Sequence, residues 1–277
     1  MEATMSSHNP LRRLTAPEIA ARKGREKIVC LTAYTAPIAE LLDPHVDLLL
    51  VGDSVGMVLH GLPTTVGVTL EMMVIHGQAV MRGSSRALVV VDLPFGSYER
   101  SPQQAHESAV TLMRKTGCQA VKVESGEGIA ETISFLVERG IPVVGHVGLR
   151  PQATNVDGGF KAKGRSTAER ERVIAEARAT DQAGAFAIVV EGVAADLADE
   201  ITRAVAAPTI GIGASPQCDG QILVTDDMLG LFDWTPKFVR RYGNLRETIS
   251  QAVQNYARDV RSGDFPGKAE LYNLKIG

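Results

Sequence analysis

Ionisable side chains close a series of short apolar runs in this chain. In the stretch DLLLVGDSVG, four apolar residues lead directly into Gly-Asp-Ser. The polar residues at the ends of such runs are Asp53, Ser54, Asp92, Lys122, Glu124, His146 and Glu191. Burying charged groups is costly unless they bind a metal, a charged ligand or one another. Together these residues predict a polar site.

Each of these residues also has an ordinary structural interpretation. An aspartate that follows a strand often caps a helix or lies in a turn, which would account for Asp53 and Asp92. Lys122 and Glu124 share one face of a strand and could form an internal ion pair. His146, alone in an apolar strand, could be a hydrogen-bonded core residue. The prediction of a site therefore depends on the coincidence of five strands.

Aspartates among other oxygen donors favour Mg²⁺ or a similar hard ion over zinc. Mg²⁺ keeps several waters, and a 2-oxo acid can displace some of them with its keto and carboxylate oxygens. Such coordination acidifies the C3 proton of the acid by stabilising an enolate. A carboxylate base would complete the chemistry. The residue types thus indicate metal-assisted proton removal from a 2-oxo acid.

Composition narrows the range of partners. The 277 residues are 44% hydrophobic and 22% charged, with a formal net charge of −3, which indicates a globular protein without a basic field for nucleic acid or anionic membrane. The three cysteines form no CxxC pair, so neither a disulfide framework nor a zinc site is predicted. The sequence has no apolar run of membrane-spanning length and no secretory signal. We expect a soluble, cytoplasmic protein that acts on small molecules.

Short apolar runs alternate with longer stretches of helical periodicity. Eight such runs occur, at residues 27–34, 47–53, 87–94, 120–125, 142–148, 186–192, 208–214 and 221–227. Helices are predicted to begin at Thr69, Ser101, Glu127 and Ser166, with a last helix at about 245–262. Apolar strands separated by helices form a parallel sheet covered on both faces. Eight units favour a closed α/β fold, the (β/α)8 TIM barrel, over an open doubly wound sheet.

The predicted domain organisation is simple. We expect a single barrel domain over residues 1–277, because no Pro- or Ser-rich linker divides the chain. Residues 1–10 are polar and are expected to be mobile. A short N-terminal helix is predicted within Thr15 to Arg22, and a C-terminal helical extension follows the barrel. Because all strands of such a barrel end on one face, their polar terminal residues should meet there.

Several motifs occur in order along most of the chain, from about Thr32 to Pro266. They are LVGDSVGMVLHG, DLPFGSY, AVKVES, GHVGLRPQ, VVEGV, PTIGIGA and CDGQILV. This set resembles the ketopantoate hydroxymethyltransferase family. The resemblance implies a (β/α)8 barrel, Mg²⁺, 3-methyl-2-oxobutanoate as substrate and 5,10-methylenetetrahydrofolate as co-substrate. It also implies a homo-oligomer, commonly a decamer, that forms 2-dehydropantoate for pantothenate and coenzyme A biosynthesis through a Mg²⁺-stabilised enolate.

The same resemblance assigns metal and substrate contacts. It implies that Asp53 and Asp92 bind Mg²⁺ and, with it, the substrate. Glu124 would reach the ion directly or through water. Ser54 would bind the substrate carboxylate through its hydroxyl and its backbone N–H, and Lys122 would pair with the same oxygens.

Two further residues and one loop complete the expected site. The resemblance implies that Glu191 is the base that removes the C3 proton, and that His146 orients substrate or folate. The segment Gly148 to Ser166 is long for a loop between a strand and a helix and fits a lid over the site, although it could be a surface excursion. Ser125 and Ser215 stand at positions where the family usually has glycine, and their effect on cofactor contacts is open.

Two other functions stay open at this stage. Related Mg²⁺ barrels cleave or rearrange 2-oxo acids through the same enolate chemistry, so a carbon–carbon lyase or mutase is one alternative. The chain has no cysteine-bearing loop between the fourth and fifth predicted strands, which disfavours the lyase. A catalytically silent barrel that binds a 2-oxo acid is the other, and the intact Asp, Lys and Glu positions disfavour it.

Overall fold

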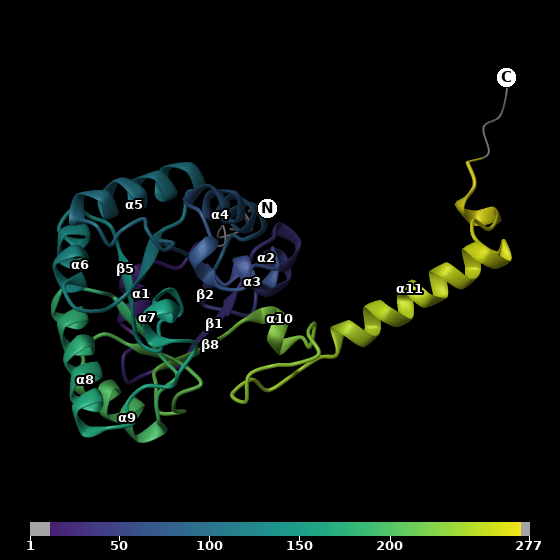
Figure 1. Cartoon of the computed structure of the whole chain (residues 1–277). Helices are drawn as coiled ribbons and strands as arrows, with labels where there is room; N and C mark the ends of the chain where they lie inside the picture. The colour runs from purple at the N-terminus through teal and green to yellow at the C-terminus, as the bar shows by residue number, and fades with distance from the viewer. Residues whose placement is uncertain (1–11, 273–277) are drawn as a thin grey trace, which may run out of the picture. The chain divides into compact units, whose positions relative to one another are not determined.

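A computed structural model describes residues 12–272 of the chain (Figure 1). The chain forms two compact units, one that ends at Thr225 and one from Asp226 onward. The second unit contains α11 (Leu245–Ser262), as predicted, and the 3₁₀ helix η3 (Lys268–Glu270). Residues 1–10, predicted to be mobile, lie outside the described residues. The single domain over 1–277 stays a prediction.

The first unit is built on a closed barrel of eight parallel strands (Figure 1). The strands are β1 (Ile28–Thr32), β2 (Leu48–Val51), β3 (Leu88–Asp92), β4 (Ala120–Glu124), β5 (Val143–Gly148), β6 (Ala187–Glu191), β7 (Thr209–Ile212) and β8 (Gly220–Leu223). Each strand pairs with the next in chain order, and β8 pairs with β1. Every residue of β2, β3, β4 and β5 is buried, which explains their continuous apolar character. The predicted (β/α)8 TIM barrel is confirmed.

The long helices between the strands cover the outside of the barrel, and shorter helices lie at its two ends. They are α1 (Ala16–Ala20), α2 (Ala36–Leu42), α3 (Val55–Val58), η1 (Thr65–Gly67), α4 (Leu70–Gly83), α5 (Pro102–Thr116), α6 (Ile129–Val137), η2 (Pro151–Ala153), α7 (Thr154–Asp157), α8 (Thr167–Gln182) and α9 (Ala195–Ala204), and α10 (Thr225–Met228) follows β8. Ser101 and Ser166 cap α5 and α8 by accepting hydrogen bonds from the N–H groups of Gln104 and Glu169. Gly117 ends α5 with φ of 82°, a conformation that favours glycine.

The interior of the barrel is a packed core. Leu50, Val90, Val144, Ile210 and Ile222 belong to one buried cluster that fills the space between the strands. The opposite strand faces and the inner sides of the helices form a second, larger cluster. Because the middle of the barrel is filled with apolar side chains, polar chemistry is confined to its ends.

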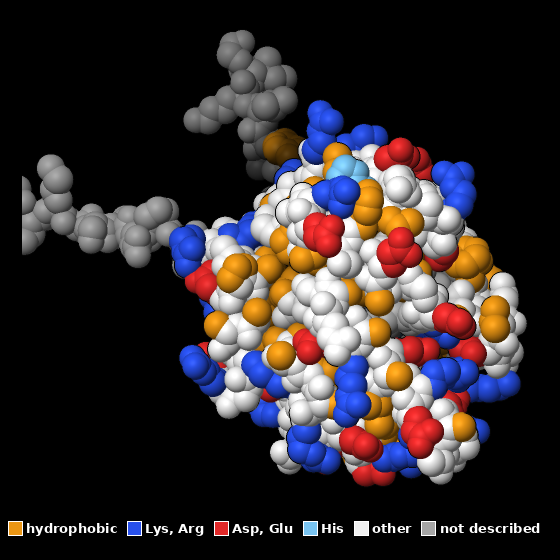
Figure 2. Space-filling model, turned by 90° about the vertical axis from the view of Figure 1, so that its left-hand side faces the viewer, with side chains coloured by type: hydrophobic (Ala, Val, Ile, Leu, Met, Phe, Trp, Pro, Cys, Tyr) orange, Lys and Arg blue, Asp and Glu red, His pale blue; other side chains and the backbone are white. Residues whose placement is uncertain are grey.

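Charges of both signs are interspersed on the surface shown in Figure 2. Lys and Arg side chains alternate there with Asp and Glu side chains around apolar and neutral surface. This face therefore presents no uniform positive field of the kind that attracts nucleic acid. Within residues 12–272, no helix is long and apolar enough to cross a membrane.

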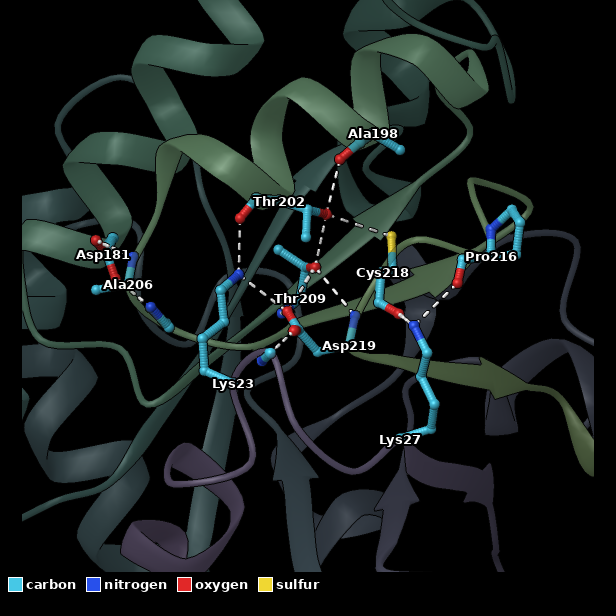
Figure 3. A network of polar contacts seen from close by, with 12 residues as sticks. Lys23, Lys27, Asp181, Ala198, Thr202, Ala206, Thr209, Pro216, Cys218 and Asp219 are labelled. Carbon is cyan, nitrogen blue, oxygen red and sulfur yellow. Dashed lines mark hydrogen bonds and ion pairs between the residues drawn. The ribbon is translucent and has the colours of Figure 1, made fainter.

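A buried aspartate closes the barrel at the amino ends of the strands (Figure 3). Asp219, which precedes β8, accepts hydrogen bonds from Lys23 Nζ at 2.9 Å and from the N–H groups of Gly24 and Thr209 at 2.8 Å. Burial raises the pKa of Asp219, but these donors lower it below its usual value. The carboxylate thus joins the segment after α1 to β7 and β8.

Candidate active site

The carboxyl ends of the strands carry the predicted polar residues. Asp92, Glu124 and Glu191 are the last residues of β3, β4 and β6, and Asp53 follows β2 after one glycine. The strand register pairs Asp92 with Lys122. Because the strands are parallel, these side chains meet at one rim of the barrel, as predicted.

Asp53, Asp92 and Lys122 form a buried polar cluster. The Asp53 N–H donates to Asp92 Oδ2 at 3.0 Å, and Lys122 Nζ lies 3.0 Å from Asp92 Oδ1. Burial and the neighbouring Asp92 raise the pKa of Asp53 to about 7. Burial lowers the pKa of Lys122, but Asp92 and Asp53 more than offset this and raise it above its usual value. Lys122 is therefore a fixed cation at neutral pH.

The donor set of this cluster fits Mg²⁺. In the part of the chain that the structure describes, no three His, Cys, Asp or Glu side chains gather closely enough to hold an ion unaided. Mg²⁺ is usually bound by one or two carboxylates together with waters and substrate oxygens, so two aspartates suffice. No described residue makes an aligned hydrogen bond to the buried Asp92 Oδ1, which leaves that oxygen with bonding capacity beyond its ion pair.

His146 lies between two glutamates at the same rim. Its Nε2 is 3.1 Å from Glu191 Oε2, and its Nδ1 is 4.0 Å from Glu124 Oε1. Burial and the charge of Lys122 lower the pKa of His146, so the imidazole is neutral at physiological pH. The Glu191 side chain is 17% exposed, whereas those of Glu124 and His146 are at most 5% exposed. Glu191 is thus the carboxylate of this group that a substrate reaches most readily.

Ser54 lies directly before α3 and contacts Tyr34, two residues after the end of β1. Its Oγ is 2.8 Å from the hydroxyl of Tyr34. The His76 Nδ1 lies 2.8 Å from the Tyr34 carbonyl oxygen, which can only accept, so this ring nitrogen carries a proton. His76 Nε2 lies 2.9 Å from Nε2 of His60. Contacts from α4 thus hold Tyr34, and Tyr34 holds Ser54; the sequence pattern does not predict the role of His76.

Two buried residues at the rim were also not predicted. Gln152 donates from Nε2 to Asp53 Oδ2 at 2.8 Å, and Tyr98 donates from its hydroxyl to Gln152 Oε1 at 2.7 Å. Gln152 belongs to the motif GHVGLRPQ, and Tyr98 to DLPFGSY. Position within these motifs is the one signal that could have found them, because neither residue type indicates metal chemistry.

The segment after β5 lies beside the site. It contains η2 and α7, and its Lys163 N–H donates to the carbonyl of Gly192 at 2.9 Å, next to Glu191. Lys163 Nζ pairs with Asp157 Oδ1 at 2.6 Å within the same segment. A lid function for this segment stays a prediction.

Ser125 and Ser215, which the resemblance places at family glycine positions, are engaged within the protein. Ser125 Oγ accepts from the His146 N–H at 3.3 Å. The Ser215 hydroxyl donates to Asp199 Oδ1 and accepts from the Gln217 N–H at 3.1 Å. Both side chains are buried, so each hydroxyl fills a structural role.

The fold and the rim define a class of protein, the (β/α)8 barrels with a polar site at the carboxyl ends of the strands. Phosphoenolpyruvate phosphomutase from Streptomyces platensis subsp. rosaceus aligns over 94% of this chain and 93% of its own, with a TM-score of 0.60 and 11% identity. A structure of phosphonopyruvate hydrolase aligns over 94% and 93%, with a TM-score of 0.59 and 15% identity. At such identities the likeness establishes the fold alone.

Sequence similarity identifies the family within this class. The profile of the ketopantoate hydroxymethyltransferases matches residues 13–268. The 3-methyl-2-oxobutanoate hydroxymethyltransferase of Phenylobacterium zucineum (strain HLK1) is 70% identical over 275 residues, 99% of this chain and 100% of the relative. That of Maricaulis maris (strain MCS10) is 65% identical over 275 residues, 99% of each chain. The chain therefore belongs to the ketopantoate hydroxymethyltransferase family, as its motifs predict.

Proposed function

We propose that this chain transfers a hydroxymethyl group from 5,10-methylenetetrahydrofolate to 3-methyl-2-oxobutanoate and forms 2-dehydropantoate for pantothenate biosynthesis. Full-length relatives at 70% and 65% identity bear the corresponding enzyme name. The observation that carries the proposal is the pairing of a reachable Glu191 with the neutral His146 at the rim that also holds Asp53 and Asp92. A base beside an oxygen-rich metal site is what proton removal next to a ketone requires.

Asp53 and Asp92 would hold Mg²⁺, with Glu124 close by. Bound there, Mg²⁺ would supply a Lewis acid that polarises the 2-oxo group and acidifies the C3 proton. The fixed cation Lys122 and the Ser54 hydroxyl would bind the substrate carboxylate, since an ammonium and a hydroxyl both donate to carboxylate oxygens.

Glu191 would remove the C3 proton, and the C–H electron pair would form the enolate. In this assignment the ring proton of His146 is on Nε2, because the Glu191 oxygen 3.1 Å away belongs to a carboxylate that only accepts. The imidazole thus orients the base. The methylene carbon of the folate is bonded to two nitrogens, and both carbon–nitrogen bonds break in the reaction. The enolate carbon forms the new bond to this one-carbon unit, water supplies its hydroxyl oxygen, and the two folate nitrogens take up the proton removed from C3 and one proton from water.

A cytoplasmic homo-oligomer completes the proposal, with the decamer that is common in the family as the expected form. Support comes from α11 in the second unit. Along this helix Ile249, Val253, Tyr256 and Val260 recur at helical spacing and are between 45% and 58% exposed in the single chain. An apolar stripe of this kind suits burial against a second copy.

Proton exchange at C3 tests the function directly. Purified protein with Mg²⁺ should exchange the C3 proton of 3-methyl-2-oxobutanoate in D₂O, as followed by proton NMR. EDTA should stop the exchange, and Glu191→Gln should slow it by about 10²–10⁴-fold, the range for a general base. Adding 5,10-methylenetetrahydrofolate should then give a hydroxymethyl signal. Folded, metal-loaded protein that neither exchanges nor forms product would contradict the proposal and leave the silent barrel or another 2-oxo acid.

A further inference from the structure

Gln152 occupies the centre of a buried hydrogen-bond network to which the proposed reaction assigns no role. It lies in η2, at the start of the segment that follows β5, and is 6% exposed. Its Nε2 donates to Asp53 Oδ2 at 2.8 Å and to the Leu93 carbonyl at 3.0 Å. The two amide protons of Gln152 are therefore both used, one on a carboxylate of the proposed metal pair.

Tyr98 fixes which way the Gln152 amide points. The Glu124 N–H donates to the Tyr98 hydroxyl at 3.2 Å, so the hydroxyl proton is free to donate to Gln152 Oε1 at 2.7 Å. On the other side of the amide, the ionised Asp53 carboxylate and the Leu93 carbonyl accept but do not donate. A flipped amide would place oxygen against oxygen, so only one orientation satisfies all three partners of the amide.

The backbone of Gln152 reaches a second carboxylate. Its N–H donates to Glu124 Oε1 at 3.1 Å and to Oε2 at 3.2 Å. Gln152 thus contacts Asp53 through its side chain and Glu124 through its main chain. One residue joins the carboxyl ends of β2 and β4 to the segment after β5.

We infer that Gln152 is a positioning residue for the metal-binding carboxylates, an inference that rests on the proposed metal site. Gln152 holds Asp53 by Oδ2, which leaves Oδ1 as the oxygen for the metal. Tyr98 locks the amide in the orientation that does this. Through its backbone contact with Glu124, Gln152 also couples the placement of η2 and α7 to the same carboxylates. Gln152 acts through Asp53 and Glu124 rather than on the substrate.

The affinity of the protein for a metal ion, measured in the absence of substrate, tests this inference independently of catalysis. The full chain is titrated with Mn²⁺, and free Mn²⁺ is measured by electron paramagnetic resonance. Gln152→Met keeps the length of the side chain and removes its hydrogen bonds, so Mn²⁺ affinity should fall at least tenfold, as is typical when a partner of a metal ligand is lost. Thr154→Ala, at a buried position in the same segment, is the matched control and should leave the affinity unchanged.

Tyr98→Phe provides the second variant. It keeps the ring and removes the hydroxyl that orients the amide, so it should weaken Mn²⁺ binding less than Gln152→Met does. If Gln152→Met does not fold, this variant decides the inference. In folded Gln152→Met, raising the Mg²⁺ concentration should restore C3 proton exchange, an effect that a general loss of structure would not show.

The outcomes separate the inference from the function. Equal Mn²⁺ affinity in wild type, Gln152→Met and Tyr98→Phe would overturn the inference while leaving the reaction in place. A wild-type chain that binds no Mn²⁺ would overturn it as well, together with the metal site. Failure of the wild type to exchange the C3 proton despite bound metal would count against the proposed function alone.

Discussion

Carboxylates at the two ends of the barrel have opposite surroundings. At the amino ends of the strands, Asp219 and Asp43 accept several hydrogen bonds from nearby backbone and side-chain donors. Burial raises the pKa of each, but these bonds lower it below the usual value. At the carboxyl ends, burial and neighbouring carboxylates raise the pKa of Asp53 to about 7 and that of Glu124 well above its usual value.

We interpret this difference in pKa as the difference between a carboxylate that stabilises the fold and a carboxylate that is placed to bind a ligand. Where the protein supplies enough donors, as at Asp219, the ionised group is satisfied in the free chain and contributes to folding. Where donors are too few, as at Asp53, the ionised group lowers the free energy of unfolding, and the proposed metal ion would offset this loss. The amino end of a barrel accordingly serves stability and the carboxyl end serves binding.

The largest effect is expected for Asp53→Asn, which removes the carboxylate with the raised pKa at the carboxyl ends of the strands. The variant should lose activity by about a thousandfold or more, since metal charge stabilisation is worth several kcal/mol. In EDTA, the free energy of unfolding of the wild type should fall as pH rises from about 4 to about 7, because the unfolded chain loses the Asp53 proton while the folded chain keeps it. Asp53 should contribute at most about 1.4 kcal/mol per pH unit to this slope, the limit for one proton, and Glu124, whose pKa is also raised, adds to it.

Urea denaturation at pH 5 and pH 8, with EDTA or with Mg²⁺, measures the effect. Asp53→Asn should show a smaller fall with pH in EDTA and little gain from Mg²⁺, whereas the wild type should gain through ligand binding to its folded state. If the variant showed the same pH dependence and the same response to Mg²⁺ as the wild type, Asp53 would be neither the carboxylate with the raised pKa nor a metal ligand.

Asp219→Ala, at the amino ends of the strands, should lower the stability of the protein and leave its activity unchanged. It leaves the Gly24 and Thr209 N–H groups without their acceptor and removes the ion-pair partner of Lys23, whose ammonium keeps the Thr202 carbonyl, so the free energy of unfolding should drop by about 3 kcal/mol. The kcat/KM should stay close to that of wild type wherever the variant is folded. Glu26→Ala is the control, because Glu26 has a 77% exposed side chain and its loss should change stability by under about 0.5 kcal/mol. Equal losses in both variants would refute the structural role of Asp219.

At the carboxyl end, the sequence predicts the residues that close the strands better than the residues that hold them in place. Asp92 and Glu191 close apolar runs, and the parallel barrel brings every such terminus to one rim, so pattern and topology suffice. Gln152 could not be found in this way, because its contacts with Asp53 and Glu124 depend on the path of a loop that no periodicity describes. The orientation of its amide depends further on Tyr98, which is distant in the chain and close only after folding.

The smallest effect is expected for Ser215→Gly, which introduces the glycine that the family resemblance implies at this position after β7. The Ser215 hydroxyl donates to Asp199 of α9 and accepts from the Gln217 N–H, so the substitution removes two hydrogen bonds that lie within the protein. The free energy of unfolding should fall by about 1 kcal/mol, the net value of one or two such bonds. The KM for 5,10-methylenetetrahydrofolate should not change, because the hydroxyl is engaged with Asp199. Steady-state kinetics beside urea denaturation distinguishes the roles: a changed folate KM with unchanged stability would place Ser215 in cofactor binding, and the reverse assigns it to the anchoring of α9.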